Sequence, residues 1–536
     1  MTMTSAREAD RLGRSAGADL SEDFGSLAFV VGAGLARLER LRSHIAGSRG
    51  GFFPGTRMLY EHELERTIDR HGRLLRALRN LGSTAREAGI GELGELSRRR
   101  REMSDLVRTE VGLSATTVIS TDWQSPSTQH SGTPAAGRHM GSIRARHDDY
   151  KRDRHHDAAG YERDYVASLG PSGHGKRAIM TSCGMSAFTT IMTYLAMEGH
   201  LRGPVLMGRH SYHECAGLLR SALGSQLIDV DESIPGAIGT AVARHRPVAV
   251  FLDSLCNEAG VIVPDLAEAC AALREVESET YLVVDNTCLS SSLLPWELAS
   301  DDAAHVRLIV HESLTKYPQF GMDLTTAGLI VAVDEDAERL DRYREHLGAN
   351  VAAISPIVLP PPDRTMLMRR LDRIGGNTEH LARLLAGSLD VQHGSLERHP
   401  SHRVCRGLPF RGGLLTVATA DSDCDALVDA ALCAARDGGV PLVAGTSFGF
   451  DTTRIYAVAN ERRSFLRIAV GIETLPEIDA LAVALLSALS PPSGSSRVAK
   501  RSFPRGYDLV STATYPVSGS YGRWDPSAAA GRDEET

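Results

Sequence analysis

Two short stretches of the sequence, YLVVDNTC (residues 281–288) and LIVHESLTKY (residues 308–317), carry most of the fold prediction. Each opens with a run of apolar residues, which is typical of a strand buried on both faces of a parallel sheet. Each then turns polar, and in open α/β sheets ligands bind beyond the carboxyl ends of the strands. The pattern therefore predicts that Asp285 and Lys316 lie at one functional edge of such a sheet.

Similar apolar runs alternate with longer amphipathic stretches between about residues 160 and 355. This alternation predicts βα units and a mostly parallel sheet that helices cover on both faces. We therefore expect a large α/β domain over residues 150–355. Its candidate strands are residues 178–180, 205–207, 248–252, 281–284, 308–310 and 328–333.

A second, smaller α/β domain is expected over residues 356–490. The motif PIVLPPPD (residues 356–363) indicates a joint, because proline interrupts regular structure. Beyond it we expect helices at residues 364–386 and 475–489, with strands near residues 413–418 and 465–470. Residues 491–536 are polar and predict a tail rather than a folded unit.

Residues 1–112 predict a helical N-terminal extension. Apolar positions near a 3.6-residue period support helices at residues 57–81 and 84–111. The run Arg98–Arg101 favours a solvated helix face over a contact with nucleotides. Residues 113–149 are rich in Ser, Thr, Gly and Pro and predict a linker or an extended arm. Breaks into short helices are expected at Gly47, Gly50, Gly51, Gly82 and Gly89.

Composition excludes several classes of protein. A chain of 536 residues is too long for one hydrophobic core, so two or three domains are expected. A net charge of −8 and an aromatic content of 5% argue against a general nucleic-acid binder. No apolar run approaches the roughly 18–20 residues that span a bilayer. Eight cysteines without a CxxC pair predict free thiols in a reducing compartment, the cytoplasm.

The chemistry suggested by these residues is that of a bound aldehyde cofactor. Lys316 follows a strand and could form a Schiff base, while the hydroxyls of Ser313 and Thr315 could meet a phosphate. Asp285 suits a protonated pyridine nitrogen. Taken singly, Asp285 could instead cap a helix and Lys316 could be solvated. A third element, Ser182-Cys-Gly-Met-Ser186, follows a strand and opens a helix, where backbone N–H groups bind anions.

The order of these motifs resembles the Cys/Met-metabolism family of pyridoxal-phosphate (PLP) enzymes, which includes cystathionine γ-synthase, cystathionine γ-lyase and methionine γ-lyase. The resemblance covers roughly residues 148–490 and implies fold type I, with a mostly parallel sheet of the seven-stranded type. Further motifs similar to those of the family are Tyr150-Lys-Arg152, His210-Ser-Tyr212, Asp253-Ser-Leu-Cys-Asn257, Ser447-Phe-Gly449 and Leu466-Arg467 through Glu473.

The resemblance implies a role for each matching residue. Lys316 would bind PLP and shuttle protons, Asp285 would keep the pyridinium protonated, and Tyr212 would stack on the ring and act as an acid or base. Arg467 would bind the substrate α-carboxylate together with Ser447 and Asn257. Tyr150 and Arg152 would reach the cofactor phosphate of a neighbouring subunit. The other residues implied in cofactor binding are Ser182, Cys183, Gly184, Met185, Asn257, Thr287, Ser313 and Thr315.

The resemblance also implies the reaction, namely γ-elimination or γ-replacement on an L-amino acid through a vinylglycine-type quinonoid. The donor would be an O-acylhomoserine, cystathionine, methionine or S-adenosylmethionine. Motif departures at Asp153-Arg-His-His-Asp157, at Glu258 and at Cys183 favour an unusual substrate and a role in specialised metabolism. A PLP-dependent C–S β-lyase is the nearest alternative, and a non-catalytic scaffold that uses the helical N-terminal region is the alternative from another class.

The expected partners are a small amino-acid substrate and a second copy of the chain, in a homodimer or homotetramer with shared sites; neither nucleic acid nor membrane is expected. No metal site is expected, because His210, His213 and Cys215 lack a second cluster. The segment Gly170–Lys176 fits only half of a phosphate-binding Walker loop, since Arg177 and a strand follow it.

Overall fold

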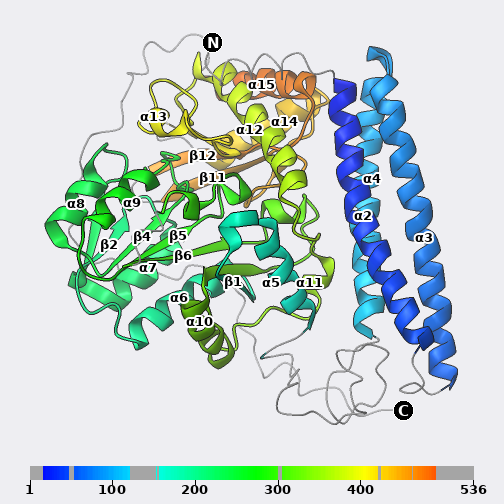
Figure 1. Cartoon of the computed structure of the whole chain (residues 1–536). Helices are drawn as coiled ribbons and strands as arrows, with labels where there is room; N and C mark the ends of the chain where they lie inside the picture. The colour runs from blue at the N-terminus through cyan, green and yellow to red at the C-terminus, as the bar shows by residue number, and fades with distance from the viewer. Residues whose placement is uncertain are drawn as a thin grey trace, which may run out of the picture. The chain divides into compact units, whose positions relative to one another are not determined.

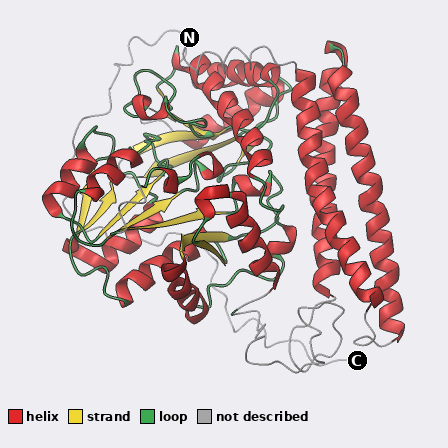
Figure 2. Cartoon of the chain, viewed as in Figure 1, coloured by secondary structure: helices red, strands yellow, loops and turns green. Residues whose placement is uncertain are grey.

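A computed structural model describes residues 16–47, 54–120, 153, 156–299, 305–419, 424–460 and 463–490. Its elements confirm an α/β enzyme-type fold with a helical N-terminal region (Figures 1 and 2). Among the described helices, none is both long and apolar enough to cross a membrane.

The N-terminal region consists of long helices rather than the expected short ones. These are α2 (Ala16–Gly47), α3 (Pro54–Glu87) and α4 (Leu93–Ser120), with the 3₁₀ turn η1 (Ile90–Glu92) before α4. The break predicted at Gly82 is wrong, because this residue lies inside α3. A Cβ at Gly82 would stand 3.6 Å from the Cβ of Phe24, an ordinary contact distance, so Gly82 lies at the face of α3 that packs on α2. Helix α4 also continues beyond residue 112 to Ser120, into the segment predicted as a linker.

The prediction for the arginine run of α4 is wrong at one position. Arg98 and Arg99 are exposed and pair with Glu95, as a solvated face requires. The side chain of Arg100, however, is only 2% exposed and reaches Asp23 of α2 at 3.3 Å. A buried guanidinium needs such a partner to offset its lost hydration.

The large domain is built on a seven-stranded sheet of order β1-β7-β6-β5-β4-β2-β3. Neighbouring strands in the run β6-β5-β4-β2-β3 are parallel. Strand β7 is antiparallel to both of its neighbours, β1 and β6. The prediction of a mostly parallel sheet is therefore confirmed. The strand β3 was not predicted, because only one of its four residues is buried. The bounds are β1 (Lys176–Thr181), β2 (Val205–Gly208), β3 (Leu227–Val230), β4 (Ala249–Asp253), β5 (Thr280–Asp285), β6 (Val306–Ser313) and β7 (Gly328–Val333).

Helices cover both faces of this sheet, as Figure 2 shows. Alternate residues of β5 separate into two apolar clusters, since Val283 packs with α6 and α7 whereas Leu282 and Val284 pack with α8 and α9. The helices are α5 (His156–Ser168), α6 (Gly184–Met197), α7 (His213–Leu223), α8 (Ala237–His245), α9 (Leu266–Arg274), α10 (Asp334–His346) and α11 (Ser355–Val358). The 3₁₀ turns are η4 (Gly170–Gly173), η5 (Gly224–Gln226), η6 (Ser290–Ser292), η7 (Pro295–Glu297) and η8 (Tyr317–Gln319).

The smaller C-terminal region packs helices on a five-stranded sheet of order β10-β11-β12-β9-β8. Helices α12 (Arg364–Ala386) and α15 (Leu475–Leu489) have the predicted bounds. Its other elements are β8 (Val391–Gln392), α13 (His402–Cys405), β9 (Leu414–Ala418), α14 (Cys424–Asp437), β10 (Val443–Ala444), β11 (Arg454–Asn460) and β12 (Arg463–Ala469).

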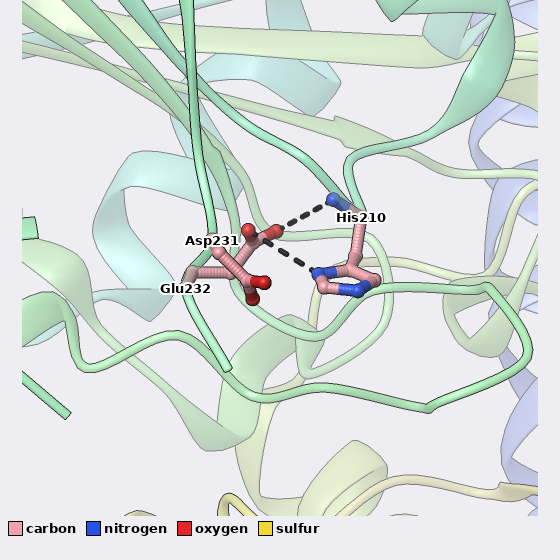
Figure 3. A group of neighbouring side chains, drawn as sticks. All are labelled: His210, Asp231 and Glu232. Atoms are coloured by element: carbon pink, nitrogen blue, oxygen red, sulfur yellow. Dashed lines mark hydrogen bonds and ion pairs between the residues drawn. The ribbon is translucent and has the colours of Figure 1, made fainter. Parts of the chain in front are cut away.

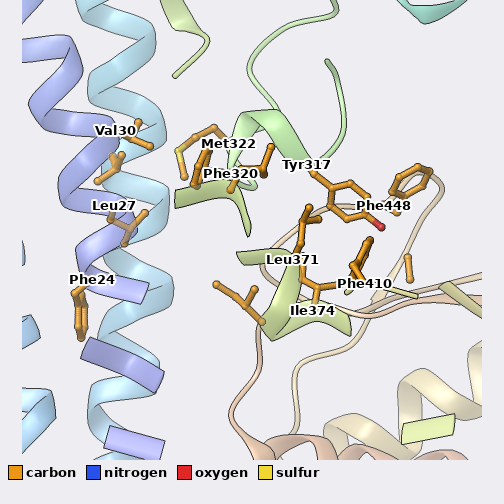
Figure 4. Close-up of a cluster of buried hydrophobic side chains, with 14 of the residues drawn as sticks. Phe24, Leu27, Val30, Tyr317, Phe320, Met322, Leu371, Ile374, Phe410 and Phe448 are labelled. Atoms are coloured by element: carbon orange, nitrogen blue, oxygen red, sulfur yellow. The ribbon is translucent and has the colours of Figure 1, made fainter. Parts of the chain in front are cut away.

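One apolar cluster joins the N-terminal helices to the rest of the chain (Figure 4). From α2 it contains Phe24, Leu27 and Val30, and from the segment after Lys316 it contains Phe320 and Met322. The rings of Phe29 and Phe320 lie 5.6 Å apart. The N-terminal helices therefore pack against the segment that follows the predicted cofactor lysine.

Candidate active site

Three titratable side chains form a row across the carboxyl ends of β4, β5 and β6. Asp253 pairs in register with Asp285, and Asp285 pairs with His311. Side chains paired across parallel strands point to the same face of the sheet. They belong to the face that α6 and α7 cover, because the ring of Phe188 on α6 lies 5.9 Å from that of His311.

Burial governs the charge of this row. Burial and the neighbouring Asp285 raise the pKa of Asp253 well above its ordinary value. Burial lowers the pKa of His311, whose imidazole is then neutral, although Asp285 acts in the opposite direction. The Asp285 carboxylate accepts a hydrogen bond from the Thr287 amide at 2.9 Å. This bond closes a turn after β5 and caps no helix, because the next element, η6, begins only at Ser290.

The segment at the start of α6 and the end of β6 forms a narrow cradle. A Cβ at Gly184 would stand only 2.8 Å from the Cβ of Ser313, so no larger residue fits. The Ser313 amide donates to the Thr287 hydroxyl at 2.9 Å, which brings Thr287 to the same place. Helix α6, which is 14 residues long, begins here, and the backbone N–H groups of a first helical turn bind anions.

The remaining residues predicted for the phosphate lie around this cradle. The thiol of Cys183 caps α6 by accepting a hydrogen bond from the Ser186 amide at 3.4 Å. The Ser182 amide donates to the Ala349 carbonyl at 2.9 Å, and the Thr315 hydroxyl accepts from the Ala327 amide at 3.5 Å. Met185 lies with its sulfur 3.6 Å from that of Cys215. Tyr150 and Arg152 lie outside the described residues.

Lys316 lies just beyond β6 and is half-buried, so it is not the solvated lysine of the alternative interpretation. Its Nζ donates to the Ser447 hydroxyl at 2.5 Å and lies 5.3 Å from the centre of the Phe448 ring. Burial lowers the pKa of Lys316, and the nearby Arg467 acts in the same direction, although Cys288 opposes it. A lysine of lowered pKa is a better nucleophile and base at neutral pH.

Arg467 reaches the pocket from β12. Its Nη1 donates to the Asn257 side-chain oxygen at 3.1 Å, so two residues predicted for substrate binding are in contact. Burial lowers the pKa of Arg467, and interactions with Cys288, Tyr456 and Tyr212 partly offset this effect. An arginine that is half-buried and bonded to a neutral amide retains donors for a carboxylate.

Tyr212 immediately precedes α7. Its amide donates to the Asp253 carboxyl at 3.0 Å, which ties the tyrosine to the row of titratable residues. Burial raises the pKa of the Tyr212 phenol, and Glu214 adds to the effect. The phenol therefore keeps its proton at neutral pH and is able to donate it.

Sequence reasoning assigned no role to two residues of this site, Asp253 and His311. Asp253 ends a buried apolar strand in the same way as Asp285, and this signal was present in the sequence. The buried Nδ1 of His311 has no hydrogen-bond partner among the described residues. Neither residue could be placed beside Asp285 until the order of the strands in the sheet was known.

A possible metal-ligand group also lies near this edge, and it is not the one considered from the sequence. Figure 3 shows His210 beside Asp231 and Glu232. The Glu232 carboxylate already accepts hydrogen bonds from the amides of Arg209 and His210 at 2.8 and 2.9 Å. Asp231 accepts from the Arg209 side chain at 3.0 Å. These bonds hold the loop that leads to Tyr212, so we assign the group a structural role.

Comparison with known proteins agrees with this geometry. The family model described as Cys/Met metabolism PLP-dependent enzyme matches residues 139–486. A curated relative, the bifunctional enzyme flvA of Aspergillus flavus, is 29% identical over 332 residues, which are 59% of this chain and 40% of that protein. The chain thus spans well under half the length of that relative.

Solved structures share the fold. A cystathionine gamma synthase from Xanthomonas oryzae pv. oryzae, in complex with aminoacrylate and cysteine, is 23% identical with a TM-score of 0.52 and covers 66% of this chain and 89% of its own. A methionine gamma lyase from Micromonospora echinospora is 21% identical with a TM-score of 0.53, covering 64% and 91%. MetB from Corynebacterium glutamicum is 20% identical with a TM-score of 0.54, covering 70% and 97%.

Proposed function

Because the chain belongs to the Cys/Met metabolism PLP-dependent enzyme family, we propose that it catalyses γ-elimination or γ-replacement on an L-amino acid with a γ-leaving group. The cofactor is pyridoxal 5′-phosphate. The observation that carries the proposal is the grouping of Lys316, Arg467 and Tyr212 near Asp285. Arg467 acts on the pKa of both Lys316 and Tyr212, and the Tyr212 amide bonds Asp253, which pairs in register with Asp285. This set offers a mobile base, a carboxylate clamp and a proton donor.

The residues present fit the cofactor. The cradle that excludes a Cβ at Gly184 admits a phosphate against the first turn of α6, with Ser182, Cys183, Met185, Ser313 and Thr315 around it. In this proposal Asp285 would face the ring nitrogen of the cofactor, with Thr287, whose amide bonds Asp285, and Asn257, which bonds Arg467, close to it. When bound, PLP withdraws electrons and so stabilises negative charge at the substrate Cα.

Lys316 acts as the proton carrier in this proposal. γ-Chemistry requires a base that removes a proton from Cα and then one from the neighbouring Cβ. The lowered pKa of Lys316 favours the neutral form of its amine compared with a solvated lysine, and its four-carbon stem can swing between the two carbons. The Ser447 hydroxyl, 2.5 Å from Nζ, holds the amine when it is at rest.

Arg467 and Tyr212 complete the arrangement. Arg467, oriented by Asn257, binds the α-carboxylate and so fixes which substrate carbons face Lys316. Tyr212 keeps its proton at neutral pH and donates it to the departing γ-substituent. We propose O-acylhomoserine, cystathionine, methionine and S-adenosylmethionine as donors to be tested.

The products distinguish this proposal from its nearest alternative. γ-Elimination with water yields 2-oxobutanoate, ammonia and the free leaving group, whereas β-elimination from cystathionine yields pyruvate, ammonia and homocysteine. The PLP-loaded enzyme is incubated with each donor, with and without a thiol acceptor, and the products are identified by mass spectrometry. We expect 2-oxobutanoate or a γ-substituted amino acid from one donor. Pyruvate from cystathionine with no γ-product would instead establish a β-lyase.

Lys316→Ala and Lys176→Ala form a matched pair for this experiment. Lys176 lies at the edge strand β1, away from the cradle, and contacts the Trp296 ring at 5.7 Å. We expect the visible absorption of bound cofactor and all turnover to be lost in Lys316→Ala and kept in Lys176→Ala. An unchanged spectrum in Lys316→Ala would remove the catalytic proposal and favour the scaffold alternative.

We further propose a cytoplasmic homodimer or homotetramer. All eight cysteines are free thiols in the structure, which supports a reducing compartment. In this proposal Tyr150 and Arg152 would reach the cofactor phosphate of a neighbouring subunit, as the resemblance implies. Analytical ultracentrifugation of the loaded enzyme tests the oligomer, and a monomer that retains full activity would contradict shared sites.

A further inference from the structure

One face of helix α4 donates hydrogen bonds to three segments that border the candidate site. The side chains recur at intervals of three or four residues and therefore share that face. Ser97 and Arg101 bond Glu477 at 2.6 and 3.1 Å, at the start of α15. Farther along, Ser104 donates to Asp451 at 2.8 Å and Arg108 donates to the Met322 carbonyl at 2.8 Å.

Asp451 connects α4 to the segment that contacts Lys316. One carboxylate oxygen accepts from Ser104, and the other accepts from Arg370 of α12 at 2.7 Å. The same Arg370 nitrogen donates to the Gly449 carbonyl at 3.0 Å. The Asp451 carbonyl accepts from the Ile472 amide at 3.0 Å, on the segment that follows β12 and Arg467.

The segment 447–451 in turn lies directly on Lys316. Gly449 has a φ of +90°, and a Cβ there would stand 2.8 Å from the Tyr317 nitrogen and 2.9 Å from the Lys316 carbonyl carbon. Ser447 also has a positive φ, +69°, which is unusual for a serine and costs free energy unless its surroundings hold it. Its hydroxyl receives the Lys316 amine.

The charge of Asp451 suits its role as the acceptor of hydrogen bonds from Ser104 and Arg370. Burial acts to raise its pKa, but Arg370 and Arg100 outweigh burial and lower the pKa below its ordinary value. The group is thus a carboxylate at neutral pH, an acceptor with capacity on both sides. Arg100 is itself supplied by α4, so the N-terminal helices contribute both a hydrogen-bond donor and a charge.

From these contacts we propose that Ser104 is a positioning residue. Through the Asp451 carboxylate it holds segment 447–451, and with it Ser447, against Lys316. The N-terminal helices are accordingly part of the scaffold of the active site rather than a separate appendage. The kinetic test of this inference rests on the proposed function, whereas the hydrogen-exchange test does not.

Hydrogen exchange of the PLP-loaded full chain provides the structural readout. In Ser104→Ala the carboxylate loses its donor from α4, and we expect the amides of residues 447–451 to exchange several-fold faster than in the wild type. Ser104→Thr retains the hydroxyl and should restore slow exchange. Thr109→Ala is the matched control, because the Thr109 hydroxyl is exposed and bonds the Asp105 carbonyl of its own helix. Equal exchange in Ser104→Ala and the wild type would overturn the proposal.

A second variant guards against a folding defect. Asp451→Asn keeps the size of the side chain and loses its charge, so it weakens the bonds to Ser104 and Arg370 together. We expect faster exchange in the same segment. If this variant and Ser104→Ala both left residues 447–451 protected, the contact would have no positioning role.

A double-mutant cycle with Ser447→Ala shows whether Ser104 acts through this segment. We expect Ser104→Ala to lower kcat/KM by about 3- to 10-fold in the wild type and by less than about 2-fold when Ser447 is already alanine. Equal losses in both backgrounds would contradict action through Ser447. If the wild type converts none of the donors, the proposed function fails, and hydrogen exchange still decides the role of Ser104.

Discussion

The individual side chains of the site are distinguished by what burial does to them. Lys316 becomes easier to deprotonate, while Tyr212 becomes harder to deprotonate, and both changes have burial as their largest cause. A base and an acid thus coexist in one pocket at neutral pH. Arg467 lies beside them and donates a hydrogen bond to the Asn257 side-chain oxygen at 3.1 Å.

Replacing Arg467 by lysine tests the carboxylate clamp. A lysine ammonium cannot form the paired hydrogen bonds that a guanidinium makes with a carboxylate. We expect kcat/KM for the accepted donor to fall by about 100-fold in Arg467→Lys, mainly through KM, with the cofactor spectrum unchanged. Arg398→Lys serves as control, because the Arg398 side chain is 53% exposed. A normal KM in Arg467→Lys would place the clamp elsewhere.

Glu312 predicts a pH dependence of stability. Burial raises the pKa of Glu312 to about 7, although Ser290 and Tyr165 donate hydrogen bonds to it. The folded chain therefore binds more protons than the unfolded chain between about pH 4.5 and 7, and this group costs stability as the pH rises through that window. The loss amounts to roughly 3 kcal/mol at about 1.4 kcal/mol per pKa unit.

Urea unfolding at several pH values measures this effect. Glu312→Gln keeps an acceptor for Tyr165 and cannot ionise, so its stability should fall less than that of the wild type between pH 4.5 and 7. Parallel curves for the two proteins would show that Glu312 is ionised in the folded chain.

Among the elements, the start of α6 and the end of β6 depend on one another. An alanine at Gly184 would bring its Cβ to 2.8 Å from Ser313, so one of the two segments must move. We expect Gly184→Ala to weaken PLP binding by at least about 10-fold, since donors at a helix N-terminus act over short distances. Fluorescence titration of the apoenzyme with PLP measures the affinity.

Gly217→Ala is the control for this element. A Cβ at Gly217, inside α7, would meet no atom within 4 Å. The substitution should raise stability by about 0.5–1 kcal/mol through helix propensity and leave PLP affinity unchanged. A similar loss of PLP affinity in both variants would contradict the cradle.

The contact between the N-terminal helices and the rest of the chain depends on buried charge. Arg100 bonds Asp23 and lies between α2 and the Ile472 carbonyl, 3.5 Å from its Nη1. In Arg100→Met the Asp23 carboxyl loses one of two cationic neighbours while it stays buried. We expect a loss of about 3 kcal/mol in unfolding free energy, because removing one partner of a buried pair leaves the other uncompensated.

Chemical denaturation of Arg100→Met and Arg99→Met tests this expectation. Arg99 is the next residue of the run, with a side chain that is 53% exposed, and its substitution should change stability by less than about 0.5 kcal/mol. Equal stability of the two variants would show that the buried ion pair contributes nothing to holding α4.

Local sequence was enough to predict most elements of the sheet and its covering helices. Helices α12 and α15 have the predicted bounds, because a capping Asp363 begins the first and a Pro at the start of the second sets its entry. The apolar runs before Asp285 and before Lys316 are strands, because continuous apolar residues favour burial on both faces of a sheet. Strand β11 was missed, since it begins with Arg454 and alternates in exposure.

Other features depend on which segments become neighbours in space. A run of four arginines carries the same local pattern throughout, yet Arg100 alone of them reaches the buried Asp23. Nothing near Ser104 in the sequence points to Asp451, which lies 347 residues away. Asp253, Asp285 and His311 form a row only because β4, β5 and β6 pair in that register. Periodicity and motif spacing act over a few residues, whereas burial and long-range hydrogen bonds arise from packing, and for this reason the former predicted the elements and only the folded chain assigned their contacts.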